Sequence, residues 1–282
     1  MESPPYFRVG FTRYSDPIDS RNRKNKNDCR VFWSERPNAC HSICFNDAAG
    51  TEIDVKVMVT REPPYFEDWE REIDNMGGNS KYLGPIGVRI GRVRADDEKT
   101  VAKVLILCAG GKCLLCNMDD MHEGQRNFLH NLLRKRKNTF YGSSNIFEDV
   151  QNLKEVCGIT VPNVKNVAEL DDSKDLSYEK LVEKYLNYAN PYFPPNYGWA
   201  NVYFDNLLIA YGAFDAYCCY ALGLRIEEKA RLVKEIELQK EAEAKRANSS
   251  KGKEKAWTSR TTRYSNLGKA KTMWVPKSGG NK

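Results

Sequence analysis

The stretch YGAFDAY, residues 211–217, places a carboxylate in the middle of an otherwise apolar segment. The surrounding residues, 207–224, are apolar at helical period, which predicts a buried helix over about residues 202–222, and the central Asp makes this segment a poor membrane span. Tyr211 and Asp215 are four residues apart, so they share one face of that helix. Because an unpaired buried carboxylate is costly, Asp215 is expected to have a partner or a function.

The sequence before this helix alternates strand and helix signals. Three strand candidates follow one another with short connections, which favours an antiparallel meander, and helices and strands then alternate. The pattern predicts an α/β fold with a mixed sheet and helices packed on its faces. The predicted strands are residues 54–60, 85–93, 101–108, 112–117, 139–141 and 164–170, and the predicted helices before residue 202 are residues 63–76, 123–136, 146–157 and 176–188.

A second carboxylate stands near the start of a predicted helix, in FYGSSNIFED, residues 140–149. Nucleases that use two divalent metal ions need carboxylates from separate elements to converge on the ions. Such a site combines an Asp-x-Glu pair on a strand, an Asp near the start of a helix, and a Tyr-x-x-x-Asp pair on a later helix. Asp149 fits the second pattern, and Tyr211 with Asp215 fits the third.

The order and spacing of these motifs resemble the Werner-like 3′-to-5′ exonucleases, the DEDD class with a tyrosine in the last motif. KVLILCAGGKCLL (residues 103–115) resembles the second and third strands of that family, LSYEKLV (176–182) resembles the helix before the last motif, and Trp199 matches the usual tryptophan ahead of it. The likeness spans about residues 52–224. It implies a ribonuclease-H-like mixed sheet with helices on both faces, and it makes Tyr211, Asp215 and Asp149 the remnant catalytic residues.

The first metal-binding motif departs from the family pattern. In PIGVRIGR, residues 85–92, Arg89 stands at the Asp position and Gly91 at the Glu position, although strand parity is kept. A guanidinium repels divalent cations, so no metal is expected, and Arg89 is expected to pair with Asp215 or Asp149 instead.

Two alternatives to this interpretation stay open. Arg89 could face a solvated edge of the sheet, and the two Asp residues would then be ordinary helix charges. The loop that follows the strand contains Asp96, Asp97 and Glu98, which could bend back and restore a site for Mg²⁺ or Mn²⁺.

Composition divides the chain into four parts. Residues 1–45 are expected to form a loosely ordered polar extension, 46–224 the exonuclease-like domain, 225–247 a solvated charged helix, and 248–282 a basic disordered tail. Nine Lys and Arg against one Glu give residues 249–282 a charge of +8, so the rest of the chain carries −2 of the total of +6.

The cysteines and the N-terminus bear on the cellular compartment. No secretory signal is visible in the sequence. The nine cysteines are therefore expected to be reduced thiols, and the protein is expected to be soluble in the cytosol or nucleus. Cys113 and Cys116 fall on opposite faces of a strand, which argues against zinc. Cys40, His41 and Cys44 are interpreted as packing residues, with a metal site as the alternative.

The function that follows is an exonuclease-like protein that binds single-stranded RNA or DNA, with metal-dependent catalysis weakened or lost. Candidate binding residues are the loop aromatics Tyr192 and Tyr197, which could equally pack in the core, and Lys251, Lys253 and Lys255 of the basic tail. The alternatives are an active 3′-to-5′ exonuclease that uses replacement carboxylates, and a non-catalytic scaffold. A scaffold would pair with related, active exonucleases in a homo- or hetero-oligomer, and no membrane association is expected.

Overall fold

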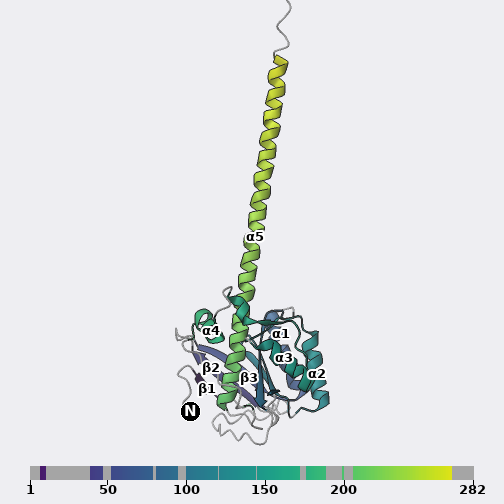
Figure 1. The fold of residues 1–282 in the computed structure, drawn as a ribbon, viewed down its shortest axis with the longest axis vertical. Helices are drawn as coiled ribbons and strands as arrows, with labels where there is room; N and C mark the ends of the chain where they lie inside the picture. Colours follow the sequence, from purple (N-terminus) through teal and green to yellow (C-terminus); the bar gives the residue numbers. More distant parts are fainter. Residues whose placement is uncertain are drawn as a thin grey trace, which may run out of the picture. The chain divides into compact units, whose positions relative to one another are not determined.

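One mixed sheet forms the centre of the fold (Figure 1). The computed structural model describes residues 7–10, 39–46, 52–78, 81–94, 100–119, 121–143, 145–171, 176–188, 199 and 206–268. Within these ranges the strands are β1 (Phe7–Gly10), β2 (Ala39–Asn46), β3 (Glu52–Val59), β4 (Ile86–Arg94), β5 (Thr100–Ala109), β6 (Lys112–Asn117), β7 (Phe140–Gly142) and β8 (Val164–Asn166). The helices are α1 (Pro63–Asp74), η1 (Asn75–Gly77), α2 (Glu123–Lys135), α3 (Ile146–Cys157), η2 (Val167–Leu170), α4 (Tyr178–Leu186) and α5 (Asn206–Gly268).

The described strands lie in the order β1-β2-β3-β6-β5-β4-β7-β8. β4, β5 and β6 pair antiparallel, which confirms the predicted meander. β3 joins β6 in parallel, while β7 and β8 extend the other edge in parallel from β4. The strand that carries Arg89 is therefore an interior strand, paired on both sides.

Helices cover both faces of this sheet, as predicted. Alternate residues of β5 enter two separate cores, because successive side chains of a strand point to opposite faces. Leu105 and Leu107 pack with side chains of α1, α2 and α3. Val104 and Ile106 pack with side chains of α4 and of the first turns of α5.

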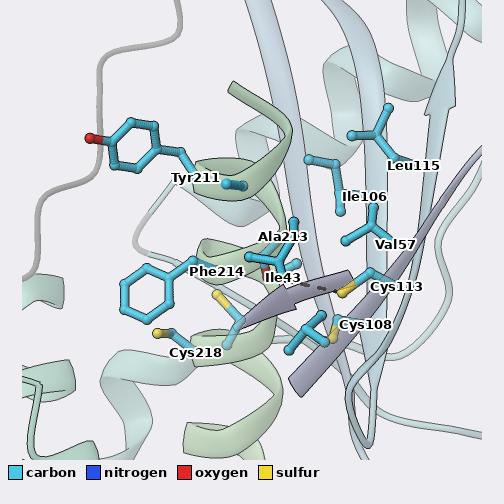
Figure 2. Close-up of a cluster of buried hydrophobic side chains, with 14 of the residues drawn as sticks. Ile43, Val57, Ile106, Cys108, Cys113, Leu115, Tyr211, Ala213, Phe214 and Cys218 are labelled. Atoms are coloured by element: carbon cyan, nitrogen blue, oxygen red, sulfur yellow. Dashed lines mark hydrogen bonds between the residues drawn. The ribbon is translucent and has the colours of Figure 1, made fainter. Parts of the chain in front are cut away.

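The core beneath α5 is apolar and contains several thiols (Figure 2). Phe214 of α5 meets the ring of Phe45 at 5.0 Å between centroids, in an edge-on arrangement. The Cys113 thiol donates to the carbonyl of Ala213 at 3.9 Å. Cys113 lies in this core and Cys116 in the opposite one, so the two cysteines of the CxxC spacing face apart, as predicted.

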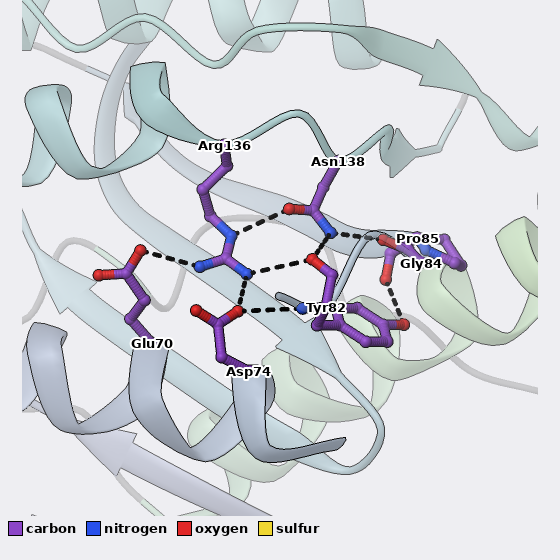
Figure 3. A network of polar contacts seen from close by, with 7 residues as sticks. All are labelled: Glu70, Asp74, Tyr82, Gly84, Pro85, Arg136 and Asn138. Carbon is purple, nitrogen blue, oxygen red and sulfur yellow. Dashed lines mark hydrogen bonds and ion pairs between the residues drawn. The ribbon is translucent and has the colours of Figure 1, made fainter. Parts of the chain in front are cut away.

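A buried arginine secures the segment that leads into β4 (Figure 3). The Arg136 guanidinium lies 3.0 Å from Glu70 Oε1 and 2.7 Å from Asp74 Oδ1, both on α1. It also donates to Asn138 Oδ1 at 3.0 Å, and the Asn138 amide in turn donates to the carbonyls of Tyr82 and Gly84. Because these acceptors immediately precede Ile86, the network fixes where β4 begins.

The N-terminal extension contributes two strands, which corrects the expectation that residues 1–45 are loosely ordered as a whole. β2 pairs with β3 along its full length, and β1 pairs with β2. In β2 the side chains of His41, Ile43 and Phe45 are buried on one face. Because the inward-facing residue His41 is polar, the alternation of apolar and polar residues that signals a strand is broken. The sequence therefore did not predict β2.

Two further boundaries differ from the predictions. The expected strand 164–170 ends at Asn166, because the Asn166 side chain accepts a hydrogen bond from the Ala168 amide and turns the chain into η2. The expected helices 202–222 and 225–247 are one helix, α5, which continues through part of the predicted tail to Gly268. Between Pro195 and Pro276 there is no proline to stop it.

The chain divides into two compact units, Met1–Glu228 and Lys229–Lys282. The first contains the sheet and the helices that pack on it. In the second, the described part is the helix Lys229–Gly268, with the side chains of residues 229–246 exposed. No helix in the described part of the chain is long and apolar enough to cross a membrane.

The buried His41 makes stability depend on pH. Burial lowers the pKa of His41 from 6.5 to about 4, so the folded state keeps the imidazole neutral where the unfolded chain protonates it. This contribution is fully present above pH 6.5 and is lost as the pH falls toward 4. Urea unfolding of the wild type and of His41→Leu at several pH values should show the wild type losing about 3 kcal/mol more than the variant between pH 7 and pH 4. Parallel curves for the two proteins would contradict this.

Candidate functional site

The candidate site lies where β4 meets α5. Ile86, Val88 and Ile90 enter the core on the α1–α3 side of the sheet. The intervening residues face α5: the space beside Gly87 is filled by backbone atoms of Ala216, and Arg89 reaches Asp215. This alternation confirms the predicted strand parity.

Arg89 and Asp215 form a buried ion pair. Arg89 Nε lies 2.8 Å from Asp215 Oδ2, and the two side chains are 16% and 7% exposed. Burial lowers the pKa of the Arg89 guanidinium, but the carboxylates of Asp215 and Asp149 raise it, and the net direction is upward. The pairing expected from the sequence is therefore present, and the solvated-edge alternative for Arg89 is wrong.

A second group engages the other oxygen of Asp215. The Tyr178 hydroxyl, from the first turn of α4, donates to Asp215 Oδ1 at 2.7 Å and contacts the Cys219 thiol at 3.3 Å. Burial, followed by the charge of Asp215, raises the pKa of Tyr178 well above its usual value, so the phenol stays protonated and acts as a donor. Burial raises the pKa of Asp215, which Arg89 and Tyr178 oppose.

Asp149 has a separate cationic partner. It lies in the first turn of α3 and forms an ion pair with the guanidinium of Arg92, which also contacts Glu148 Oε1 at 2.9 Å. Burial raises the pKa of Asp149, while Arg92 and then Arg89 lower it. A register shift between Gly91 and Arg92 marks the point where the ladder with β5 is irregular.

The ring of Trp199 fills the space beside Gly91. A Cβ atom at Gly91 would lie 2.9 Å from the five-membered ring of the indole, and one at Gly212 of α5 would lie 2.9 Å from Cη2 of its six-membered ring. The indole is 4% exposed and belongs to the core beneath α5. Trp199 thus packs between two glycines, one on β4 and one on α5, where a carboxylate at position 91 would need to lie.

The remaining predicted residues have different outcomes. Tyr211 lies one turn before Asp215 in the same core, with its ring directed away from Ile106 and Leu115 (Figure 2). The loop residues Asp96, Asp97 and Glu98 and the aromatics Tyr192 and Tyr197 lie outside the described residues. For Lys251, Lys253 and Lys255 the structure describes the helical backbone, and their side chains are not described.

Sequence reasoning missed two partners of the site. Arg92 lies on β4 with Arg89, but strand alternation predicts that its side chain points to the opposite face of the sheet. The sequence therefore assigned it no role in the site. Tyr178 lies in the LSYEKLV segment, which was interpreted only as a helix. A tyrosine in the first turn of a short helix carries no local signal of what it contacts, because its partner Asp215 is 37 residues away.

The described side chains do not fit a pair of divalent metal ions. Of the four carboxylates that such a site needs, the described residues provide Asp149 and Asp215, and each is paired with an arginine. Within the described ranges, no three His, Cys, Asp or Glu side chains are grouped so that they could hold a metal. The cations already present at these carboxylates are guanidinium groups, which cannot be deprotonated at ordinary pH.

Comparisons place the architecture among known structures. No protein-family model and no curated protein matches the sequence. Among solved structures, the catalytic core of RRP6 from Trypanosoma brucei matches with a TM-score of 0.51 and 9% identity, over 62% of this chain and 47% of that one. Escherichia coli RNase D matches with a TM-score of 0.46 and 15% identity over 62% and 46%, and the Aedes aegypti Nibbler EXO domain with 0.44 and 9% over 60% and 86%.

The extent of these matches limits what they show. The chain spans about half the length of the RRP6 core, and at 9% identity the likeness concerns the course of the backbone. The mixed sheet with helices on both faces agrees with that likeness. The chain therefore has the ribonuclease-H-like fold of the 3′-to-5′ exonuclease domains that its sequence motifs resemble.

Proposed function

We propose that this protein binds single-stranded nucleic acid and has lost, or largely lost, the metal-dependent catalysis of the exonucleases whose fold it has. The observation that carries the proposal is the Arg89–Asp215 ion pair, with 2.8 Å between Nε and Oδ2. The guanidinium is placed against a carboxylate that a divalent ion would need. A guanidinium cannot take the place of the metal ion in catalysis, because it does not coordinate a water molecule and lower its pKa, and it stays protonated at ordinary pH.

The charges of the side chains at the site support the loss of metal binding. A two-metal site gathers several carboxylates to offset four positive charges. At this site two carboxylates are replaced by Arg89 and Gly91, and Arg92 adds a second guanidinium beside Asp149. Two unit charges 4 Å apart interact by about 4 kcal/mol at an effective dielectric constant of 20, so a divalent ion near either arginine would be strongly repelled.

Packing supports it independently. Restoring a Glu at position 91 would require the Trp199 indole to move, because a Cβ atom alone would lie 2.9 Å from the ring. The six-membered ring of the same indole lies equally close to Gly212 of α5. The loss of the first motif is therefore built into the packing of β4 against α5, as well as into the charges.

The nucleic-acid part of the proposal rests on the fold and on the basic C-terminal segment. Residues 249–282 carry a charge of +8, and Trp257, Tyr264 and Trp274 are interleaved among the cations. Lys and Arg bind phosphates in a salt-dependent manner, and aromatic rings stack on unpaired bases. An active enzyme and a scaffold that assembles with an active relative remain as the outcomes that would replace this proposal.

A digestion assay tests the proposal directly. The full chain, incubated with 3′-labelled single-stranded RNA or DNA and Mg²⁺ or Mn²⁺, should release no more nucleotide than a protein-free sample, yet should bind the same strands in EDTA. Asp215→Asn should behave like the wild type in the digestion assay. Hydrolysis that disappears in both Asp215→Asn and Asp149→Asn would establish the active enzyme, and absence of binding at low salt would favour the scaffold.

The ion pair should be needed for folding, because Arg89 is the counter-charge of a buried carboxylate. Arg89→Met should cost about 3–5 kcal/mol, whereas Arg89→Met with Asp215→Leu should cost less, because no charge is then left unpaired. In the single variant the pKa of Asp215 rises further above its unfolded value, so the cost should be larger at pH 7 than at pH 5. Urea unfolding at the two pH values measures this.

A matched control is the exposed pair of Arg71 and Asp68, whose N–O distance is 2.9 Å and whose arginine side chain is 68% exposed. Arg71→Met should cost less than about 1 kcal/mol. If Arg89→Met proved no more costly than Arg71→Met, the guanidinium would not be the counter-charge that the site requires.

The contact between Gly91 and Trp199 gives a further test. Gly91→Ala should destabilise the protein by about 1–3 kcal/mol, because the added methyl group overlaps the indole. In a Trp199→Leu background the same substitution should cost clearly less, since the two residues compete for one space. Equal costs of Gly91→Ala in both backgrounds, measured by urea unfolding, would show that the indole does not limit position 91.

A further inference from the structure

The helix of the second unit has two halves of different charge. Residues 229–244 contain four Lys and Arg and four Glu, so their charges cancel. Residues 245–268 contain seven Lys and Arg and one Glu, a net charge of +6. Both halves belong to the continuous helix α5. The positive charge is thus concentrated in the last six to seven turns of the helix, by the usual 3.6 residues per turn.

Helical geometry places the cations and aromatic residues of the second half relative to one another. At about 100° per residue, five positions fall within an arc of about 60°. These positions are Arg246, Lys253, Trp257, Arg260 and Tyr264. The three cations repeat every seven residues, as do the two aromatic residues, so each series advances by about 10 Å per step along the axis.

The other charges of this half lie off that face. Lys251 and Lys255 fall about 140° and 180° from Arg246, on the opposite side of the helix, and Glu254 falls about 80° away. The selected face therefore combines cations and aromatic residues and contains no carboxylate. Lys251, Lys253 and Lys255 are all candidate binding residues from the sequence, but on a helix the position of Lys253 lies on a different side from those of Lys251 and Lys255.

We propose that this basic aromatic face, the positions of Arg246, Lys253, Trp257, Arg260 and Tyr264, is the surface that binds single-stranded nucleic acid. The inference rests on the proposed function and locates it outside the exonuclease-like site. Cations at regular intervals match a chain of phosphates, and aromatic residues between them match bases that are free to stack. A duplex hides the faces of its bases, so the aromatic residues select for single strands.

Two comparisons favour this face over other surfaces and other partners. At the exonuclease-like site, Arg89 and Arg92 are already neutralised by Asp215, Asp149 and Glu148, so they offer no net attraction to phosphate. A helix that lies on a membrane needs a continuous apolar face. In residues 245–268 the two aromatic residues are separated by a cation, and serine and threonine flank them.

A pair of matched double variants tests the assignment in the full chain. Lys253→Gln/Arg260→Gln removes two cations from the face, and Lys245→Gln/Arg263→Gln removes two cations of the same basic half that lie about 100° from Arg246, off the face. Anisotropy with a labelled oligo(U) RNA and oligo(dT) DNA, in EDTA, should show the first variant binding at least about tenfold more weakly. Its slope of log affinity against log salt should fall by roughly 1.4, at about 0.7 per phosphate contact, and the control should change little.

A separate variant tests the aromatic residues of the face. Trp257→Leu should weaken binding by about fivefold to a hundredfold for loss of one stacked base, without changing the salt slope. The wild type should bind a duplex of the same sequence more weakly than the single strand. Circular dichroism should show the same helix content in all variants, which excludes unfolding of the helix as the cause.

Each contrary result has a distinct meaning. Equal loss in the two double variants would overturn the assignment of a face, because only total charge would then matter. Wild-type binding that Lys253→Gln/Arg260→Gln leaves unchanged would place the binding surface elsewhere and leave the proposed function intact. Failure of the wild type to bind any oligonucleotide at low salt would overturn the proposed function itself. Tighter binding to phosphatidylserine vesicles than to oligonucleotides at the same ionic strength would identify a membrane surface instead.

Discussion

The burial of Asp215 at the contact between α5 and the sheet is the constraint on which the site depends. A carboxylate in this position needs a compensating positive charge, and the cost of leaving it alone is several kcal/mol. In a metal-dependent nuclease the ions supply that charge. In this protein the Arg89 guanidinium supplies it at 2.8 Å, and the Tyr178 hydroxyl engages the second oxygen at 2.7 Å. The arginine is covalently part of β4, so the compensation is always present and requires no ligand.

Arginines connect the strands and helices around the site in a different way from metal ions that several carboxylates share. A pair of metal ions is coordinated by several carboxylates at once. A guanidinium pairs only with the carboxylates within reach of its own position on the strand. β4 provides two such groups: Arg89 pairs with α5, and Arg92, after the register shift at Gly91, pairs with α3. Gly91, which lacks a side chain, leaves room for the Trp199 indole. Charge and packing at the site therefore support one another, and a carboxylate introduced at position 89 or 91 alone would conflict with the neighbouring groups.

Much of this arrangement could be predicted from the sequence, because it follows from local periodicity. Strand parity placed Arg89 on the side of Asp215, and the short connections identified the β4–β5–β6 meander. What the sequence concealed depends on contacts between distant segments. β2 was hidden because a buried His41 breaks its apolar alternation, and the role of Tyr178 depends on a residue 37 positions away. The Trp199 contact with Gly91 was hidden for the same reason, since a glycine gives no sign of what fills the space beside it.

The distribution of charge determines where a polyanion would be attracted to this chain. Salt limits the reach of an exposed charge to about 8 Å at physiological ionic strength, so local excess matters more than the total of +6. In the ion pairs that the described residues form at the exonuclease-like site, two guanidinium groups face three carboxylates, a sum of −1. Residues 245–268 carry +6 with a single Glu among them. A phosphate chain would thus gain little by approaching the ion pairs of Arg89 and Arg92 and much more by lying along the helix, so the surface that we propose binds nucleic acid is separate from the exonuclease-like site.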